Sequence, residues 1–536
     1  MTTKSGGGDL FLGLDASTQT LKAVLVDREF NVIADEAINF DHALPEFQTQ
    51  GGVHRHPDGL TVTSPAIMWV AALDLLLAAM QAKKWPLNRV AAMSGSGQQH
   101  GSVWLRKKAR SVLRLLDSRR PLRSQLESVF TVEDSPIWMD SSTRRQCLAL
   151  ERALGGPQAV ARLTGSRAYE RFTANQIAKI HATRPQVYAE TDRIALVSSF
   201  MAALFMGDYA PLDAADASGM NLMNVRTKKW APAALRATAP GLELKLGRIV
   251  PSHRVIGTVQ TYYAERYGFN PGCLVAAFSG DNPCSLAGLR LQRPGDVAIS
   301  LGTSDTVFGS LRVCRPSASE GHIFANPVDP RGYMALICFK NGSLTREFVR
   351  DMAADKSWEV FARLLAMTPA GNDGRIGFYI RDPEITPPIF KPGIYRFDSR
   401  GRRVKTFPPE AEVRAVLEGQ FLAMRLHGAN LGLRPTNILA TGGASVNPAV
   451  LKVMSDVFGV PVFVGEQPNS AAVGAAYRAL HAWVCRRRGR FVPFAEVMRD
   501  APPFSKAADP DPRAQQVYRA MLRRYAELEK KLVDAK

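Results

Sequence analysis

The residue with the clearest chemical potential is Asp281, which stands in the turn Ser279-Gly280-Asp281-Asn282-Pro283. The turn follows an apolar run, Leu274 to Phe278, and precedes a helix-like run, Cys284 to Leu291. Ligands of open α/β sheets gather at such places, where a strand ends near a helix N-terminus. A carboxylate there could orient an attacking hydroxyl and take its proton in a phosphoryl transfer. The alternative is an aspartate that caps the helix, and the residues alone leave both interpretations open.

Two further turns are rich in serine and threonine and also follow apolar runs. Residues 10–14 lead into Asp15 and a turn that contains Thr18, and residues 296–301 lead into a turn that contains Thr303. Hydroxyl and backbone N–H groups in such turns could hold phosphate oxygens. Asp15 ends a predicted buried strand, where a divalent ion escorting a nucleotide would offset its charge. The alternative is an Asx-turn that stabilises its own hairpin.

Two polar clusters and one tryptophan have the chemistry to bind a sugar and a base. His100, within Gln98-Gln99-His100-Gly101, could donate a hydrogen bond to sugar oxygens, and Arg171 could fork onto one or two of them. Trp358 follows a plausible helix cap, Ser357, and could stack on a base or simply pack. Taken singly, each of these side chains is more often structural, so the alternatives stay open.

Several classes of protein are excluded or disfavoured. The sequence has no GxxxxGK[ST] phosphate loop, no HRD or DFG pair and no GxGxxG motif. No apolar run approaches the ~20 residues that cross a bilayer. The six cysteines are scattered without a CxxC pair, which favours a reduced compartment, the cytoplasm, over a disulfide framework or a zinc site.

The net charge of +19 is the one unusual bulk property. The basic clusters are short and are not interleaved with stacking aromatic residues, so they predict a solvated surface, with attraction of anions as the alternative. Nucleic acid and membranes are therefore not expected as partners.

The elements that must position these residues follow from hydrophobic periodicity. Strands are expected at residues 10–14, 21–27, 31–40, 90–94, 274–278, 296–301, 438–441 and 460–465, and helices at 65–83, 447–458 and from 470 onward. Asn447 suits the cap of its helix and Pro448 the first helical position. The pattern of strand, hydroxyl-rich turn and strand occurs in both halves of the chain, which predicts two lobes of like architecture. The last ~35 residues are predicted to form a peripheral helix.

Together these motifs resemble the FGGY carbohydrate kinases along nearly the whole chain, and within that family the animal-type members that act on D-xylulose. The motifs are LGLDASTQTLK (12–22), LPEFQTQGGVH (44–54), SGSGQQHGS (94–102), WMDSST (138–143), LTGSRAYERFTANQIAKI (163–180), SGDNPCSLAG (279–288), SLGTSDT (300–306), CFKNGSLTRE (338–347) and LATGGASVN (439–447). Many members carry glycine where this chain has Ser17, and commonly an arginine after the Trp-x-Asp motif. These departures narrow the subfamily and make a polyol such as glycerol less suitable.

The resemblance implies an α/β protein in which two ribonuclease-H-like domains, as in actin and hexokinase, flank a deep cleft. The expected division is a sugar-binding lobe at residues 1–290 and a nucleotide-binding lobe at 291–536. Asp281 matches the catalytic base. The implied sugar ligands are His100, Arg171, Asp281 and Asn282. The implied ATP ligands are Thr18, Thr303, Trp358, Gly442, Gly443, Ala444 and Asn447, and Asp15 matches the carboxylate facing Mg²⁺.

The implied activity is transfer of the ATP γ-phosphate to the 5-hydroxyl of D-xylulose, with ATP and Mg²⁺ as cofactors. The alternatives are a kinase of another sugar, such as ribulose or gluconate, and a non-catalytic actin-like nucleotide-binding protein. An intact Asp281 argues against the second, because a pure switch needs no base aimed at a sugar. The expected partners are the sugar and ATP alone, and the expected state is a monomer or homodimer in the cytoplasm.

Overall fold

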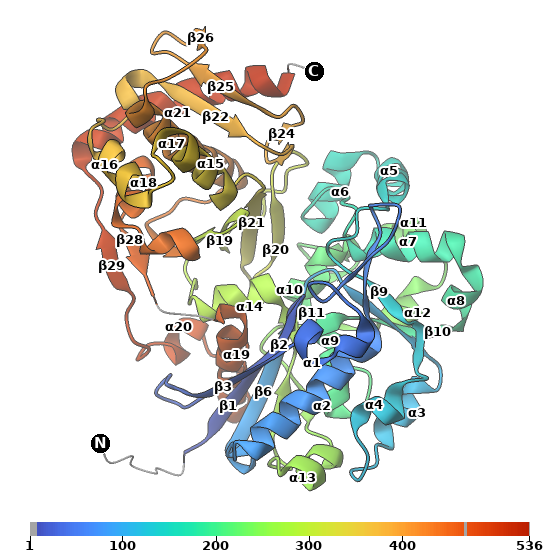
Figure 1. The fold of residues 1–536 in the computed structure, drawn as a ribbon. Coiled ribbons are helices and arrows are strands. Elements are labelled where there is room, and N and C mark those ends of the chain that lie inside the picture. The colour runs from blue at the N-terminus through green and yellow to red at the C-terminus, as the bar shows by residue number, and fades with distance from the viewer. Residues whose placement is uncertain (1–7, 466–468, 535–536) are drawn as a thin grey trace. The chain divides into compact units, whose positions relative to one another are not determined.

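The computed structural model describes residues 8–465 and 469–534, which divide into two compact units (Figure 1). The first unit comprises the chain up to Gln292, the insertion Phe324–Gly332 and a late segment that ends at Pro502. The second comprises Arg293–Ile323, the chain from Tyr333 to residue 465, and the chain from Pro503 onward. The predicted boundary at residue 290 lies beside the first crossing, after Gln292, whereas the insertion Phe324–Gly332 and the late segment that ends at Pro502 had no counterpart in the prediction.

A mixed sheet forms the centre of the first unit, with strand order β15-β16-β6-β1-β2-β3. The strands are β1 (Leu10–Ala16), β2 (Thr20–Val26), β3 (Val32–Asn39), β6 (Val90–Gly97), β15 (Val255–Thr258) and β16 (Leu274–Ala276). Strands β1, β2 and β3 form an antiparallel meander, whereas β6 runs parallel to β1 and β16 parallel to β6. A short strand, β17 (Ser279–Gly280), continues along β6. The three predicted strands at the start of the chain are thus confirmed.

Alternation along β1 decides which side chains face which layer of helices. Leu12 and Leu14 belong to the apolar core that contains helix α2 (Ala66–Ala82). Phe11 has the opposite parity and contacts Trp483 of helix α19 (Ser470–Arg488), with ring centroids 5.5 Å apart. Asp15 has the parity of Phe11, so the strand presents its carboxylate on the α19 side of the sheet.

The second unit has a sheet of the same kind, with strand order β20-β21-β19-β18-β27-β28-β29. Its strands are β18 (Asp296–Leu301), β19 (Asp305–Leu311), β20 (His322–Ala325), β21 (Tyr333–Phe339), β27 (Asn437–Thr441), β28 (Val462–Val464) and β29 (Ser505–Ala508). Strands β18, β19 and β21 are antiparallel, and β27 and β28 continue from β18 in parallel. The order β21-β19-β18-β27-β28 therefore repeats β3-β2-β1-β6-β16, and the predicted likeness of the two lobes is confirmed.

The main helices of the second unit are α15 (Ser343–Ala353), α16 (Trp358–Ala366), α17 (Pro409–Leu431), α18 (Pro448–Phe458) and α21 (Pro512–Asp534), of which α17 and α18 contact its sheet. Asn447 caps α18 and Pro448 occupies its first position, as predicted. Helix α21 is not peripheral, because it buries Tyr518 and Tyr525. The sequence alone could not show this burial, since the helix packs against segments far away along the chain.

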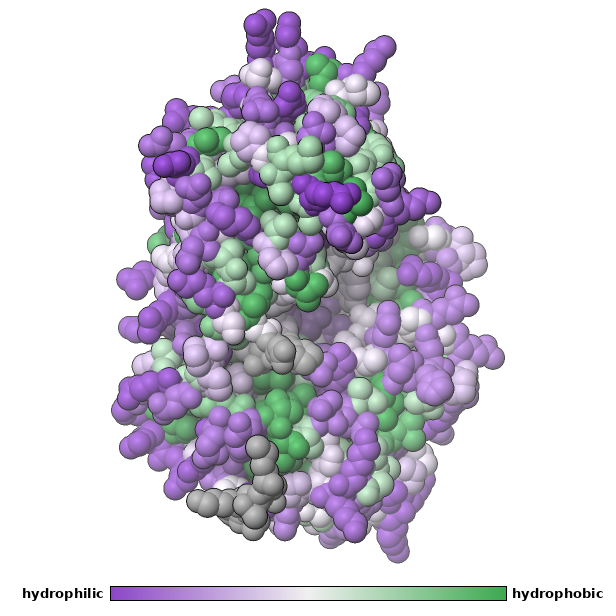
Figure 2. Space-filling view, turned by 60° about the vertical axis from the view of Figure 1, so that its left-hand side comes forward, coloured by the Kyte–Doolittle hydropathy of each residue, from purple (hydrophilic) through white to green (hydrophobic). Residues whose placement is uncertain are grey.

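On the face shown in Figure 2, hydrophilic residues are spread around smaller hydrophobic patches. None of the helices in the described part of the chain has the length and apolarity to cross a membrane.

Candidate active site

Asp281 is the first residue of α14 (Asp281–Gly288), directly after β17. One of its carboxylate oxygens, Oδ1, accepts hydrogen bonds from the backbone N–H of Asn282 at 2.9 Å and from the Asn282 side-chain amide at 3.2 Å. Gly280 occupies the cap position of the helix, so the alternative interpretation of Asp281 as the cap residue is wrong. The carboxylate is held at a helix N-terminus beyond the end of a strand, as the sequence predicted for a catalytic group.

The protonation of Asp281 is tuned by its surroundings. Burial, and to a smaller extent the negative charge of Asp15, raise the pKa of this carboxyl to about 7, against hydrogen bonds from the backbone N–H groups of Asn282 and Gln99. A pKa near the working pH suits a general base, because the ionised form is then well populated and still basic enough to take a proton.

Asp15 ends β1 opposite Ser96 of β6, whose hydroxyl donates to Asp15 Oδ1 at 2.6 Å. Burial raises the pKa of Asp15, and the Ser96 hydrogen bond and the charge of Lys22 oppose that shift. Within residues 8–465 and 469–534, no lysine or arginine forms an ion pair with this carboxylate, which is 5% exposed. Asp15 and Asp281 are thus two acidic groups whose mutual repulsion a cation would relieve.

The hairpin after Asp15 is closed by other residues. The backbone N–H and the hydroxyl of Ser17 both donate to the carbonyl of Thr20, at 3.0 and 2.9 Å. The Asx-turn interpretation of Asp15 is therefore wrong. Thr18, at the tip, accepts a hydrogen bond from the indole N–H of Trp138 at 2.8 Å and is partly exposed, so its hydroxyl can still donate to a phosphate oxygen.

His100 lies on Phe172, with ring centroids 4.3 Å apart, and its Nδ1 is 2.7 Å from the carbonyl oxygen of Gly219. Because a carbonyl only accepts, Nδ1 carries the proton. Burial lowers the pKa of His100 to about 3, with a contribution from the charge of Arg171, so the ring is neutral. Its Nε2 is therefore an acceptor. The prediction that His100 donates to sugar oxygens is wrong in direction.

Three neighbours extend this polar surface. Arg171 places its guanidinium carbon 5.1 Å from the ring centroid of Tyr169. Asn282 donates from its amide to Gln99 Oε1 at 3.0 Å. Gln98 is 2% exposed, yet neither of its side-chain amide atoms has a hydrogen-bond partner among the described residues. A buried polar group left unsatisfied costs roughly 1–3 kcal/mol, which favours a ligand that satisfies it.

The turn that contains Thr303 joins β18 to β19 in the second unit, and Thr303 itself is exposed. Asp305 at the start of β19 forms a two-pronged ion pair with Arg346 of α15, with Nη1–Oδ2 at 2.6 Å and Nη2–Oδ1 at 3.0 Å. Both side chains are essentially inaccessible to solvent. The backbone N–H of Ser343 also donates to the Gly302 carbonyl at 2.8 Å, so the start of α15 fixes the position of the turn.

The glycine turn after β27 lies at the same edge of that sheet. Thr441 pairs with Ser300 in the parallel ladder, so β27 and β18 end side by side. Gly442 has φ +84°, and a Cβ there would lie 2.6 Å from the Leu301 carbonyl oxygen, so only glycine fits. Gly443 and Ala444 follow in a 3₁₀ turn, and Asn447 Oδ1 accepts the N–H groups that open α18. The geometry places this turn beside the Thr303 turn.

Trp358 is the first residue of α16, whose cap is Ser357, as predicted. Its side chain is 39% exposed and lies 4.8 Å from the guanidinium carbon of Arg350, measured from the ring centroid. The purely packing interpretation is therefore incomplete, because a large part of the indole remains accessible. Stacking on a base stays a prediction.

Two acidic groups near Asp281 were missed by sequence reasoning. Burial, with smaller contributions from the charges of Asp213 and Asp281, raises the pKa of Asp216 to about 8. Asp216 accepts a hydrogen bond from the Ser198 hydroxyl at 2.5 Å. Both aspartates lie in a short segment, PLDAADASG, that carries no recognisable motif, so no local signal marked them.

Known proteins match this chain over nearly its full length. Residues 131–288 match the N-terminal domain of the FGGY family of carbohydrate kinases, and residues 297–483 match its C-terminal domain. Mouse xylulose kinase is 54% identical over 526 residues, which cover 98% of this chain and 94% of that relative.

Two solved structures from Lactobacillus acidophilus share the fold. A ligand-bound xylulose kinase and a gluconate kinase each superpose with a TM-score of 0.78 at 20% identity, covering 98% of this chain and 99% of theirs. The equal scores show that the fold does not distinguish the two sugars.

Proposed function

The chain belongs to the FGGY family of carbohydrate kinases, and from that premise we propose that it transfers the γ-phosphate of ATP to the 5-hydroxyl of D-xylulose, with Asp281 as the base. The choice of sugar rests on the high identity to mouse xylulose kinase. The observation that carries the chemistry is the Asp281 carboxylate, held beyond β17 with its pKa raised to about 7.

In this reaction Asp281 orients the sugar hydroxyl and accepts its proton. The sugar oxygen forms a bond to the γ-phosphorus while the bond from that phosphorus to the β,γ-bridging oxygen breaks, and ADP leaves. The base contributes roughly 10²- to 10⁴-fold, whereas in-line positioning accounts for ~7–11 kcal/mol of the barrier. Positioning therefore outweighs proton transfer.

Asp15 is the residue we assign to Mg²⁺. Mg²⁺ usually binds one or two carboxylates, phosphate oxygens and water, and a buried carboxylate that forms no ion pair with the described residues fits that donor set. Bound there, the ion would offset charge on the phosphates. Thr18 would donate its hydroxyl to the same phosphate chain.

On the sugar side, we assign His100 Nε2 as an acceptor for one hydroxyl and Arg171 as a donor to another. Asn282 already donates its side-chain amide to Gln99 and Asp281, so we assign its Oδ1 as an acceptor. Gln98 joins them, because its amide lacks a partner among the described side chains and offers both a donor and an acceptor.

On the nucleotide side, Thr303 and the turn of Gly442, Gly443 and Ala444 supply N–H and hydroxyl groups at one sheet edge. We assign phosphate binding to Thr303 and adenosine binding to the glycine turn. Asn447 and Trp358 complete the assigned adenosine ligands, Trp358 through its accessible indole face.

We further propose a cytoplasmic enzyme whose partners are the sugar and ATP, without nucleic acid or a membrane, as a monomer or homodimer. The six cysteines are scattered along the sequence without a CxxC pair, which supports a reducing compartment.

The assignment is tested by measuring ADP release with D-xylulose, ribulose, gluconate and glycerol, with product identified by phosphorus NMR. We expect D-xylulose to give the largest kcat/KM and a 5-phosphate ester. Preference for gluconate, which the shared fold allows, would correct the substrate, and release of ADP at the same rate without any sugar would contradict the kinase assignment.

A further inference from the structure

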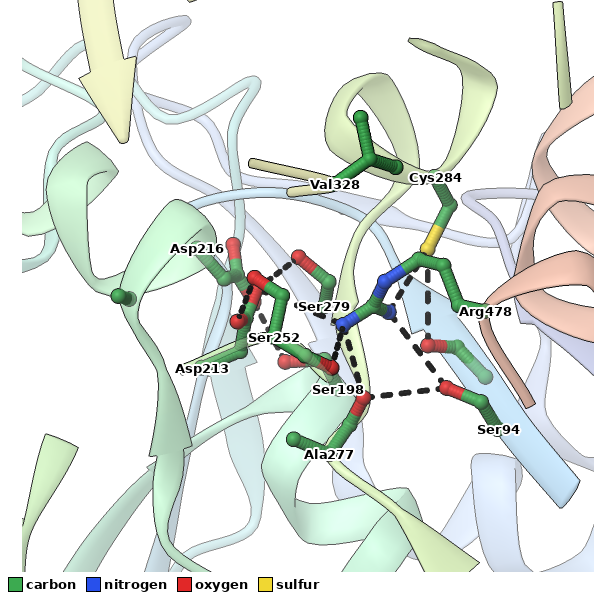
Figure 3. Close-up of polar contacts among 12 residues, drawn as sticks. Ser94, Ser198, Asp213, Asp216, Ser252, Ala277, Ser279, Cys284, Val328 and Arg478 are labelled. Atoms are coloured by element: carbon green, nitrogen blue, oxygen red, sulfur yellow. Dashed lines mark hydrogen bonds and ion pairs between the residues drawn. The ribbon is translucent and has the colours of Figure 1, made fainter. Parts of the chain in front are cut away.

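The segment that leads into Asp281 is backed by a buried polar cluster that no motif pointed to (Figure 3). Its core consists of Arg478 from α19, Asp213 from β11 (Leu212–Asp213), and the serines Ser94, Ser252 and Ser279. All of these side chains are less than about a tenth exposed. Asp281 lies two residues after Ser279, so whatever fixes Ser279 also limits the motion of the base.

Arg478 holds the start of the segment. Its Nη2 donates to the Ala277 carbonyl at 3.0 Å and to the Ser252 carbonyl at 3.1 Å. The Ser94 hydroxyl donates to the same Ala277 carbonyl at 3.0 Å. The guanidinium lies 3.8 Å from Asp213 Oδ2, so the two buried charges offset each other.

Asp213 holds the end of the segment. Its Oδ2 accepts a hydrogen bond from the Ser279 hydroxyl, and its Oδ1 accepts one from the Ser252 hydroxyl. Figure 3 shows Asp213 on one side of the segment and Arg478 on the other. The segment before Asp281 is therefore fixed by hydrogen bonds at two points, the Ala277 carbonyl and the Ser279 hydroxyl.

The intervening Gly280 has no side chain with which to anchor the strand. A Cβ at Gly280 would lie 2.3 Å from Gln99 Cγ and 2.7 Å from Asp216 Oδ1, so no larger residue fits without a shift. The carboxylate of Asp281 itself must stay available to its substrate. On the strand side of Asp281, Ser279 is thus the nearest residue whose side chain ties the strand to the body of the unit.

Docking of α19 does not require the buried charge. The helix approaches the sheet through small residues: a Cβ on Gly13 would lie 2.0 Å from the Ala472 carbonyl oxygen, and one on Gly474 would lie 1.8 Å from the Cys284 carbonyl oxygen. A buried ion pair is weak evidence for stability, since apolar replacements of both partners are often neutral or stabilising. The charges are therefore better explained by the geometry they impose.

We propose that Ser279, Asp213 and Arg478 are positioning residues that set the place of the Asp281 carboxylate relative to the reacting hydroxyl. The inference rests on the proposed role of Asp281 as the base. A displacement of about 1 Å can lower a rate roughly 10²-fold, so loss of the Ser279 grip acts on turnover and leaves ATP binding unchanged.

The chain offers a matched pair of variants, Ser279→Ala and Ser252→Ala. Each removes one serine hydroxyl that donates to the Asp213 carboxylate, but only Ser279 is joined to Asp281 by a short stretch of strand. We expect Ser279→Ala to lower kcat roughly 10- to 100-fold with KM for ATP changed less than about twofold. Ser252→Ala should change kcat less than about threefold, with a similar shift of the urea midpoint in both variants.

Variants at Arg478 or Asp213 would leave a buried charge unpaired and could fail to fold, which is why the serines are used. Equal effects of the two serine variants on kcat, while Asp281→Asn lowers kcat roughly 10²- to 10⁴-fold, would overturn the positioning role and leave the base in place. Near-normal turnover of Asp281→Asn would overturn the base itself.

A double-mutant cycle tests whether Ser279 acts through Asp281. In the Asp281→Asn background, Ser279→Ala should change the residual rate less than about twofold, because the group it positions is gone. An effect as large as in the wild-type background would show that Ser279 acts independently of Asp281 and would overturn the proposal.

Discussion

The two units contain the same kind of hairpin, but the aspartate next to its turn has different partners in each unit. In the first unit, β1 and β2 flank a turn next to Asp15, which accepts a hydrogen bond from Ser96 but forms no ion pair within the described chain. In the second, β18 and β19 flank a turn next to Asp305, whose carboxylate is neutralised by Arg346. The shared strand order makes the contrast one of side chains rather than of backbone.

The contrast indicates that the Asp15 carboxylate is available to a ligand, whereas the Asp305 carboxylate stabilises the structure. Asp15 remains costly until a cation arrives, and its negative charge raises the pKa of Asp281. Asp305 fixes the β18–β19 turn and leaves Thr303 exposed for a ligand. If Asp15 holds Mg²⁺, as proposed above, the first turn is neutralised only when the metal and its nucleotide bind, whereas Arg346 neutralises the second turn without a ligand.

The largest expected effect concerns the neutralised pair. Arg346→Met should lower the free energy of unfolding by roughly 3–5 kcal/mol, because Asp305 would be left charged and buried. Urea unfolding measures the loss. Arg346→Met combined with Asp305→Leu is the control and should recover most of it. A single variant that loses less than about 1 kcal/mol would contradict the structural role of this pair.

Substitution of Asp15, which forms no ion pair with the described residues, should lower activity rather than stability. We expect Asp15→Asn to lower kcat/KM for ATP in the presence of Mg²⁺ roughly 10²- to 10³-fold, because charge on the phosphates is no longer offset. Its melting temperature without ligands should stay equal or rise, since a buried charge is removed. If Asp15→Asn lowered the melting temperature and left the kinetics normal, Asp15 would have a structural role like that of Asp305, and the contrast between the two would be wrong.

The pH dependence sharpens the comparison further. A base with a pKa of about 7 gives a kcat/KM for the sugar that falls about tenfold per pH unit below that value. The same raised pKa means that the folded state binds more protons than the unfolded state between about pH 4 and pH 7. This carboxyl therefore lowers stability as pH rises through that window. A profile of kcat/KM against pH that is flat from about pH 5 to about pH 8 would contradict a base with a pKa of about 7.

The smallest expected effect is at the exposed tip of the second turn. Thr303→Ala should raise KM for ATP several-fold, about 1 kcal/mol for one lost hydrogen bond, and should leave unfolding unchanged. Ser304→Ala in the same turn is the matched control. Loss of stability in Thr303→Ala would show that its hydroxyl supports the turn rather than a ligand.

The sequence predicted what depends on neighbouring residues. Apolar runs gave the strands that flank Asp15, and Asn447 with Pro448 marked the start of α18. The sequence could not predict contacts between distant segments: Arg346 beneath Asp305, or Arg478 behind the strand of Asp281. Nor could it assign the proton of His100, because the deciding carbonyl belongs to Gly219, far along the chain.

The most direct test of Asp281 is ADP release with D-xylulose for wild type and for Asp281→Asn, at saturating ATP, with ATP binding and melting temperature measured on the same samples. We expect kcat to fall roughly 10²- to 10⁴-fold while ATP binding is retained. The melting temperature should be unchanged or higher, because the substitution removes a buried carboxyl group whose ionised form burial disfavours. Near-normal turnover in the folded, ATP-binding variant would contradict the assignment of Asp281 as the base.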